Sequence, residues 1–301
     1  MRSHRRLAAL ATISCMLGAC ASADTIIVSG ASGQLGGLVV EELLARGVAP
    51  ERLILVSRTP EALERWAALG ASTRFGDFGQ PESLEAAYDG GDRMLLISID
   101  TGVGEGRAEL HGNAIAAAVA AGVRHIAYTS FVDLDRNDSP LAADHRRTEQ
   151  SLRESGVAWT MLRNSLYMNG VVTRAARMLA EGRVVSTNVG GVAYVTREDC
   201  ARAAAAVLAT DGHENRAYDI TGPSVVFSQD IARAASEVTG VAIEVVEPVP
   251  SQSGEPASAP PGAASFAVVS TAVRDLTGRA PESVADLLAA NRDQLLAAPA
   301  R

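Results

Sequence analysis

The sequence predicts an α/β protein whose core is a doubly wound parallel sheet. Up to residue 163, apolar β-branched runs alternate with longer segments of helical periodicity, as in repeated strand–helix–strand units. The strand-like runs are apolar throughout, which indicates a sheet covered by helices on both faces. The chain is rich in Ala, Val and Leu, and its low aromatic content of 4% suits helix–sheet packing better than an all-β fold.

The first strand and helix are the most clearly marked elements. Residues 25–29 form an apolar run that ends at a glycine, which is typical of a buried strand. In residues 34–46, leucines and valines recur at helical spacing, and Gly47 ends the helix.

The other elements of this half follow from the same criteria. Apolar runs predict strands, and periodic segments with Pro in the first turn or Gly at the end predict helices. We expect strands at 52–57, 72–77, 93–99, 123–130 and 157–163, and helices at 60–70, 81–88, 105–121 and 141–155.

Beyond residue 163 the alternation becomes less regular. Thr196 has the character of an N-cap, because acidic residues and an Ala-rich helical segment follow it. Residues 249–265 are dense in Pro, Ser, Gly and Ala and predict a flexible loop. We expect helices at 166–181, 196–210, 228–239, 266–276 and 281–297, and strands at 216–221 and 241–248.

These elements divide the chain into three parts. Residues 1–23 are a signal-like segment, and residues 24–163 form the main sheet domain. Residues 164–301 form a small α/β C-terminal region that interleaves with the sheet. At 301 residues, the chain is long enough to bury a substantial core.

Composition excludes several classes of function. The net charge of -8, with no clustered positive charge, argues against a nucleic-acid partner. The histidines and cysteines form no metal-binding spacing such as CxxC or HExxH, so we expect no metal site. All 27 basic residues are Arg, which excludes any mechanism that needs a lysine. Oligomeric state stays open, with a homodimer as one option.

The N-terminal sequence allows two interpretations. A basic stretch, MRSHRR, precedes an uncharged run of 13 residues and then LGAC, which resembles a bacterial lipobox with Cys20 as the lipidated residue. This reading places the protein on a membrane of the cell envelope. Alternatively, the start codon is misassigned and a cytoplasmic protein begins near Thr25, because the first strand follows Cys20 closely and nicotinamide cofactors are abundant in the cytoplasm.

The first strand leads into a glycine-rich turn with the spacing GxxGxxG. In such a turn Gly30 permits the tight bend, Gly33 lets a pyrophosphate approach the backbone, and Gly36 lets the helix pack close to the strand. The helix N-terminus supplies free N–H groups for phosphates. The placement between a strand and a helix predicts a dinucleotide-binding domain of the Rossmann type, although an ordinary glycine turn is the alternative.

The end of the second strand indicates which dinucleotide binds. An NAD site usually carries an acidic residue there for the ribose 2′-hydroxyl, whereas this chain has Ser57, Arg58 and Thr59. Arg58 is placed to bind a 2′-phosphate through charge-assisted hydrogen bonds, so we expect NADP(H). An unspecific surface arginine is the alternative.

Several motifs together resemble a known family. The segments SGASGQLG, LVSRTPE, GVRHIAYTS, SPLAADHRRTEQSLRESGVAWTMLRN and YDITG are similar to those of the NmrA-like atypical short-chain dehydrogenases, and within them to the type-2 NAD(P)H:quinone oxidoreductases. The resemblance extends from about residue 25 to 246. It implies a Rossmann domain, a C-terminal substrate region, NADPH binding and hydride transfer to quinones.

The resemblance also assigns cofactor residues by position. It implies that the pyrophosphate, the adenine and the nicotinamide ribose lie along three consecutive loops. The residues implied are Ser32, Gln34 and Leu35 for the pyrophosphate, Asp77 and Phe78 for the adenine, and Ser98 and Ile99 for the ribose. Thr129 and Ser130 end the fifth strand, where ligands bind in such sheets, although their hydroxyls could equally cap the next turn.

His145 is the main candidate for catalysis. Many relatives carry a lysine here, whereas the quinone-reductase branch has a histidine. Without lysine the chain cannot use the Tyr-xxx-Lys pair of typical short-chain dehydrogenases, which favours hydride transfer to a quinone with the proton from His145 or water. A histidine that contacts only ribose or water is the alternative. Asn164 and Tyr167 follow the sixth strand and are further catalytic candidates, because we expect both to point into the cleft. Tyr167 either stacks on a flat substrate there or is a core aromatic.

Two departures from the family bear on the substrate. Gly170 stands where the family typically has Asn, and residues 249–265 replace helices that usually help to cover the substrate. A second function therefore stays open, a non-catalytic NADP(H)-sensing regulator. A serine hydrolase is weaker still, because Gln34 breaks the GxSxG motif.

Overall fold

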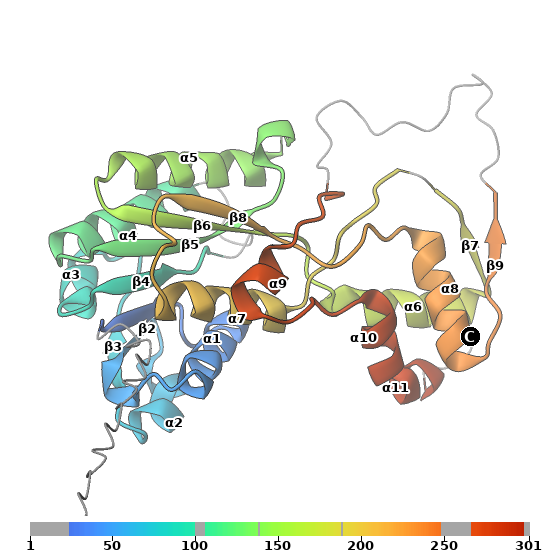
Figure 1. Ribbon diagram of the computed structural model, residues 1–301, viewed down its shortest axis with the longest axis horizontal. Coiled ribbons are helices and arrows are strands. Elements are labelled where there is room, and N and C mark those ends of the chain that lie inside the picture. Colours follow the sequence, from blue (N-terminus) through green and yellow to red (C-terminus); the bar gives the residue numbers. More distant parts are fainter. Residues whose placement is uncertain (1–23, 100–105, 138, 188, 248–265, 298–301) are drawn as a thin grey trace, which may run out of the picture.

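A seven-stranded parallel sheet forms the larger of two lobes (Figure 1). The computed structural model describes residues 24–99, 106–137, 139–187, 189–247 and 266–297. The strand order is β3-β2-β1-β4-β5-β6-β8, so the chain winds outward from β1 to β3 and then crosses to β4 on the other side. The strands are β1 (Ile26–Ser29), β2 (Leu53–Ser57), β3 (Ser72–Phe75), β4 (Arg93–Leu96), β5 (His125–Phe131), β6 (Ala158–Asn164) and β8 (Arg216–Ile220).

Helices cover both faces of this sheet, as the continuous apolar strands predict. In β1, Ile26 and Val28 pack on the face covered by α1, α2 and α7, whereas Ile27 packs on the face of α3, α4 and α5. Helix α9 packs against α7 at the edge of the first of these layers (Figure 1). The helices are α1 (Gln34–Ala45), α2 (Glu64–Ala67), α3 (Leu84–Tyr88), α4 (Arg107–Ala120), α5 (Pro140–Glu154), α7 (Arg197–Ala209) and α9 (Ala272–Thr277).

The predicted N-cap at Thr196 is confirmed. Its hydroxyl oxygen accepts a hydrogen bond from the Asp199 backbone N–H at 3.0 Å and donates to the Asp199 carboxylate at 2.8 Å. That buried carboxylate also accepts from the Glu282 backbone N–H at 3.0 Å. The cap therefore starts α7 and fastens the C-terminal part of the chain to it.

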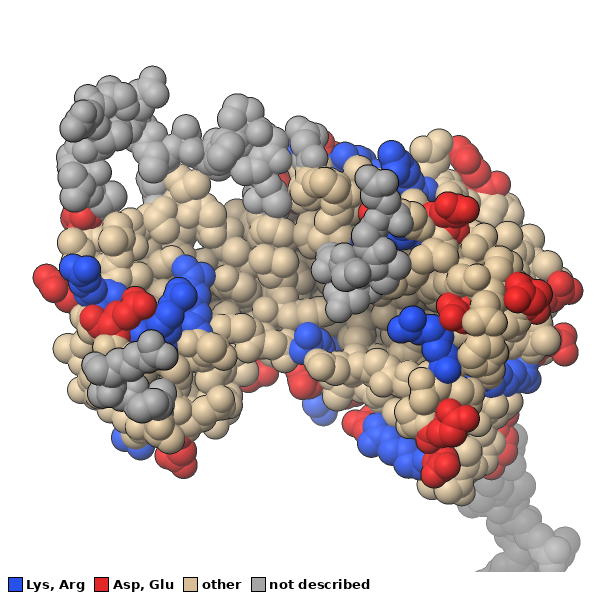
Figure 2. Space-filling model, turned by 180° about the vertical axis from the view of Figure 1, so that it is seen from behind, with Lys and Arg blue, Asp and Glu red and all other residues tan. Residues whose placement is uncertain are grey.

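The second lobe is smaller and has its own core. Its helices are α6 (Asn169–Glu181), α8 (Ser228–Thr239), α10 (Val284–Ala290) and α11 (Arg292–Ala297), and a two-stranded parallel sheet joins β7 (Arg183–Val185) to β9 (Glu244–Val246). Apolar side chains of α6, α8, α10 and α11 fill the centre. Figure 2 shows a notch between the lobes and, on that face, basic and acidic side chains interspersed.

Four sequence predictions need correction. The helix expected at 266–276 begins only at Ala272, because Phe266 pairs with Val192 in an isolated β-bridge. The helix expected at 281–297 is divided into α10 and α11. The helices expected at 60–70 and 81–88 each begin with a 3₁₀ turn, Pro60–Leu63 and Pro81–Ser83, before the short α2 and α3.

Some predictions lie outside the described residues. These are the signal-like segment with Cys20, the loop at 249–265 and the start of the helix expected from residue 105. Within the described ranges, no helix has the length and apolar character needed to cross a membrane.

Candidate active site

The glycine turn brings β1 and α1 into close contact. Gly30 has a φ of +94°, a conformation that side chains disfavour. A Cβ on Gly36 would lie 2.2 Å from the Gly30 carbonyl oxygen and 2.8 Å from Ala31 Cα, so only glycine fits there. Gly33 is the N-cap of α1 and offers no side chain, which leaves the first N–H groups of the helix for an anionic ligand.

A cavity of about 370 Å³ opens in front of this turn. It lies at the carboxyl ends of β1, β2, β3 and β4, beside the point where the chain switches sides of the sheet. A smaller cavity of about 280 Å³ adjoins it along the start of α1, lined in part by Ser32, Gly33 and Gln34. The main cavity is lined by Ser29, Gly30, Ser32, Gly33, Val56, Ser57, Arg58, Thr59, Gly76, Asp77, Phe78, Gly79, Ile97, Ser98, Ile99 and Leu110.

The end of β2 presents a positive charge to this cavity. Arg58 is exposed and has no hydrogen bond or ion pair with any described residue. Asp77 is the one acidic residue among the described lining residues, and its carboxylate accepts hydrogen bonds from the Gly79 N–H at 3.0 Å and the Gln80 amide at 3.4 Å. A guanidinium without a competing partner fits a ribose 2′-phosphate.

Buried polar groups fix the end of β4. The Ser98 backbone N–H donates to Thr129 Oγ1 at 2.8 Å, and that hydroxyl donates to Ser98 Oγ at 3.1 Å. The Ile99 N–H donates to His111 Nε2 at 3.0 Å, and Arg107 Nε donates to the Ile99 carbonyl at 3.0 Å. Thr129 therefore positions Ser98, which lines the cavity, but Thr129 is not itself one of the lining residues.

His145 lies on α5 above the end of β5 and is 96% buried (4% exposed). Its Nδ1 is 2.7 Å from the Tyr128 hydroxyl, and its ring stacks on Phe131 at 5.6 Å with an interplanar angle of 9°. Burial, and then the nearby Arg107, lower the pKa of His145 to about 3. The imidazole is therefore neutral at pH 7, which suits a hydrogen-bonding role better than release of a stored proton.

Ser130 belongs to a buried ion network. Its hydroxyl donates to Glu149 Oε1 at 2.7 Å, and Arg163 and Arg153 contact the same carboxylate at 2.7 and 2.9 Å. Burial alone would raise the pKa of Glu149, but the hydrogen bonds from Arg163 and Ser130 outweigh it and lower the pKa. Through Glu149, Ser130 thus holds α5 onto β5, and Arg163 holds the same helix onto β6.

Asn164 and Tyr167 do not line the cavity. Asn164 is buried at the end of β6, in register with Phe131. Tyr167 packs against the apolar core shared by α1 and α7, and the Arg197 guanidinium covers its ring at 4.7 Å. The structure thus favours the core-aromatic interpretation of Tyr167.

The structure brings most of the predicted cofactor residues together. Leu35 and Gly36 lie behind the turn, in the packed helix, and His145, Thr129, Ser130, Asn164 and Tyr167 lie outside the cavity. Gln34 lines the smaller adjoining cavity. The predicted residues that line the main cavity are Gly30, Ser32, Gly33, Arg58, Asp77, Phe78, Ser98 and Ile99. His111 and Tyr128 were not predicted as site residues from the sequence. For His111 the available signal was its imidazole side chain within the otherwise Ala-rich helical segment 105–121.

Comparison with known proteins matches this geometry. A sequence profile described as NAD(P)H-binding fits residues 30–211, from the glycine turn to the end of α7. The chain belongs to the NAD(P)H-binding, NmrA-like family. The resemblance inferred from the motifs is therefore confirmed.

Named relatives place this family member among the reductases. Quinone oxidoreductase 2 of Escherichia coli K12 is 37% identical over 71% of this chain and 73% of its own length. The NAD(P)H azoreductase of Xenophilus azovorans is 28% identical over 73% of this chain and 76% of its own. These matches confirm the predicted class, an NAD(P)H-dependent oxidoreductase.

Solved structures confirm the Rossmann-type fold. The Citrobacter sp. triphenylmethane reductase, complexed with NADP(H), has a TM-score of 0.74 at 32% identity and covers 90% of this chain and 99% of its own. The Escherichia coli quinone oxidoreductase complexed with NADPH has a TM-score of 0.74 at 29% identity, with the same coverages. The glycine cradle and Arg58 agree with binding of such a cofactor.

Proposed function

We propose that the protein is an NADPH-dependent reductase that transfers a hydride to quinones or related small electrophilic carbonyl compounds. The observation that carries the proposal is the cavity at the carboxyl ends of β1, β2, β3 and β4, with Arg58 on its wall and not paired with any described residue. Bound NADPH supplies the hydride. The chain supplies the binding site, the orientation and the surrounding hydrogen bonds.

The choice of NADPH over NADH rests on charge. A 2′-phosphate beside Arg58 gains charge-assisted hydrogen bonds, whereas NADH has no phosphate there. The free N–H groups at the start of α1 serve the pyrophosphate of either cofactor, so they do not discriminate.

The choice of acceptor rests on what the active-site residues can do. The chain has no lysine, and His145 is neutral at pH 7, so neither a lysine nor an imidazolium at this position can protonate an ordinary ketone. A quinone accepts hydride readily because the negative charge spreads over a conjugated ring. The relatives named for quinones, azo compounds and triphenylmethane dyes support a conjugated acceptor.

The test is oxidation of NADPH by the full chain with and without 1,4-benzoquinone, followed by absorbance. We expect quinone-dependent turnover. Tight NADPH binding without turnover over a panel of quinones would overturn the proposal and favour the non-catalytic sensor. Absence of NADPH binding would overturn both.

A further inference from the structure

Three buried side chains form a hydrogen-bonded chain between α4, β5 and α5. His111 and Tyr128 are fully buried, and His145 is nearly so. The Tyr128 hydroxyl is 3.5 Å from His111 Nδ1 and 2.7 Å from His145 Nδ1. The ring centroid of Tyr128 lies 5.5 Å from that of His111 and 5.7 Å from that of His145.

The proton on His111 can be placed from its partners. The Ile99 backbone N–H donates to Nε2 at 3.0 Å, so Nε2 is an acceptor and the proton of the neutral ring is on Nδ1. Burial and the charge of Arg107 lower the pKa of His111 to about 3, so this ring is neutral at pH 7. Nδ1–H donates to Thr148 Oγ1 at 3.0 Å, and the Thr148 hydroxyl donates to the Asp144 carbonyl at 3.0 Å.

The proton on His145 follows from these assignments. Burial raises the pKa of Tyr128, so its phenol keeps its proton. His111 Nδ1 already carries a hydrogen and cannot accept from it, whereas His145 Nδ1 is close and can. Tyr128 therefore donates to His145 Nδ1, and the neutral His145 ring carries its own proton on Nε2.

The His145 ring is held in place, whereas its Nε2 is bonded by no residue in the described part of the chain. Stacking on Phe131 fixes the ring plane, and Phe131 in turn meets Phe266 edge-to-face at 5.1 Å. Nε2 has no hydrogen-bond partner among the described residues, and the His145 side chain, although 4% exposed, does not line the cofactor cavity itself. It lies above the end of β5, the strand next to β4, whose end lines the cofactor cavity.

We propose that Tyr128, His111 and Thr148 are positioning residues that hold His145 as the Nε2–H tautomer, and that this N–H donates a hydrogen bond to a carbonyl oxygen of the quinone. The proposal rests on the proposed function. The hydride brings two electrons to the quinone, negative charge develops on its oxygen, and the Nε2–H hydrogen bond stabilises that charge. Water then supplies the proton that completes the hydroquinone, and His145 keeps its own proton throughout.

The surrounding charges agree with a neutral donor. Burial, and then the Arg107 guanidinium of α4, disfavour a positive charge on His145, whereas the neighbouring His111 is neutral. Glu149 of α5 favours one, but its carboxylate is already paired with Arg163 and Arg153. The quinone reaction should consequently show no ionisation of His145 between about pH 5 and 9, in contrast to a histidine acid that titrates near its ordinary pKa.

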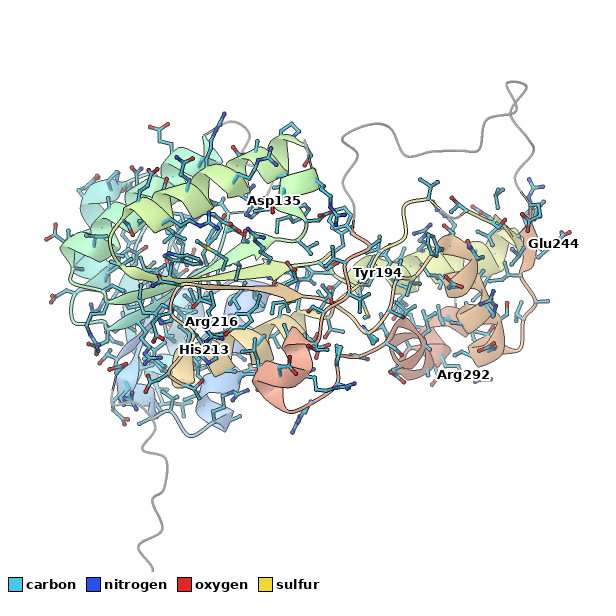
Figure 3. The ribbon with its side chains drawn as sticks, turned by 45° about the horizontal axis from the view of Figure 1, so that its top comes forward. Asp135, Tyr194, His213, Arg216, Glu244 and Arg292 are labelled. Carbon is cyan, nitrogen blue, oxygen red and sulfur yellow. The ribbon has the colours of Figure 1, made fainter. Side chains whose placement is uncertain are left out.

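The test compares two tyrosine variants of the full chain. Tyr128→Phe removes the hydroxyl that orients His145. Tyr218→Phe is the matched control, because the Tyr218 hydroxyl contacts His213 Nδ1 at 2.9 Å. His213 lies in the segment just before β8, far from the lobe junction marked by Tyr194 (Figure 3). We expect Tyr128→Phe to lower kcat with benzoquinone about tenfold, with unchanged NADPH Kd, and Tyr218→Phe to change kcat less than about twofold.

Two further measurements separate positioning from folding. His145→Leu should lower kcat about 100-fold, and His145→Gln, which keeps an N–H donor, should recover part of that loss. Nitrogen-15 NMR of labelled histidine should show His145 as the Nε2–H tautomer from pH 5 to 8, and as a mixture of tautomers in Tyr128→Phe.

Equal effects of the two tyrosine variants on kcat would overturn the proposal. An Nδ1–H tautomer or an imidazolium at pH 7 would overturn it too. The NMR result does not depend on turnover, so a chain that fails to reduce quinones would refute the proposed function while the tautomer is still decided.

Discussion

Gly36→Ala should damage the cofactor site more than any other change of one methyl group in the glycine turn. The added Cβ would lie 2.2 Å from the Gly30 carbonyl oxygen and 2.9 Å from its carbonyl carbon, both backbone atoms. An ordinary contact needs about 1 Å more, so α1 must move away from β1 by about that distance.

The expected magnitudes follow from that displacement. Overpacking lowers the free energy of unfolding by about 1–3 kcal/mol. The higher helix propensity of Ala offsets up to about 1 kcal/mol of this loss. The N–H groups at the start of α1 move with the helix, and hydrogen bonds to phosphate that lengthen by about 1 Å are lost. We therefore expect the NADPH Kd to rise at least about tenfold, whereas the melting temperature falls by only a few degrees.

The assay is calorimetric titration of NADPH into the full chain, with Gly112→Ala as control. Gly112 lies inside α4, and a Cβ there would meet nothing within 4 Å. The control should bind NADPH normally and melt slightly higher. An unchanged NADPH Kd in Gly36→Ala would refute the assignment of this turn as the pyrophosphate site.

Three further predictions concern cofactor choice, acid stability and the N-terminus. Arg58→Glu should raise the NADPH Kd about 10- to 100-fold and leave the NADH Kd nearly unchanged, and equal losses for both would contradict the 2′-phosphate assignment. Burial lowers the pKa of His111 and His145 to about 3 and that of His125 to about 4, so below pH 6.5 the unfolded chain binds more protons than the folded one. As the pH is lowered below 6.5, the free energy of unfolding should therefore decrease by about 1 kcal/mol per pH unit for each histidine. Urea titrations that show no decrease from pH 7 to pH 5 would contradict the burial of these rings. If Cys20 is lipidated, the intact mass of the mature chain will show acylation and Cys20→Ala will leave the membrane fraction, whereas an unmodified chain beginning near residue 25 supports the misassigned start.

The sequence predicts the elements that depend on local pattern. The apolar run before Gly30 and the periodic segment after it locate β1 and α1 closely, because strand burial and helix amphipathicity are properties of neighbouring residues. The same holds for the N-cap at Thr196, whose partner Asp199 is three residues away.

Features that depend on contacts between residues distant in the sequence could not be predicted from it. Phe266 lies in a segment with helical composition, but it pairs with Val192, 74 positions earlier in the chain, in an isolated β-bridge. The strand β7 has only three residues, too few for a periodic signal. Tyr128 reads as one more apolar residue of β5, and only the fold brings its hydroxyl to His145, 17 residues away.

The most direct test of the central claim is the initial rate of NADPH oxidation by the full chain with benzoquinone, measured against NADH under the same conditions. The proposed function predicts turnover that requires the quinone and has a kcat/KM at least about tenfold higher with NADPH than with NADH, because we propose that Arg58, on the cavity wall, binds the 2′-phosphate. Bound NADPH that no quinone oxidises would contradict the reductase, and equal rates with both cofactors would contradict the role of Arg58.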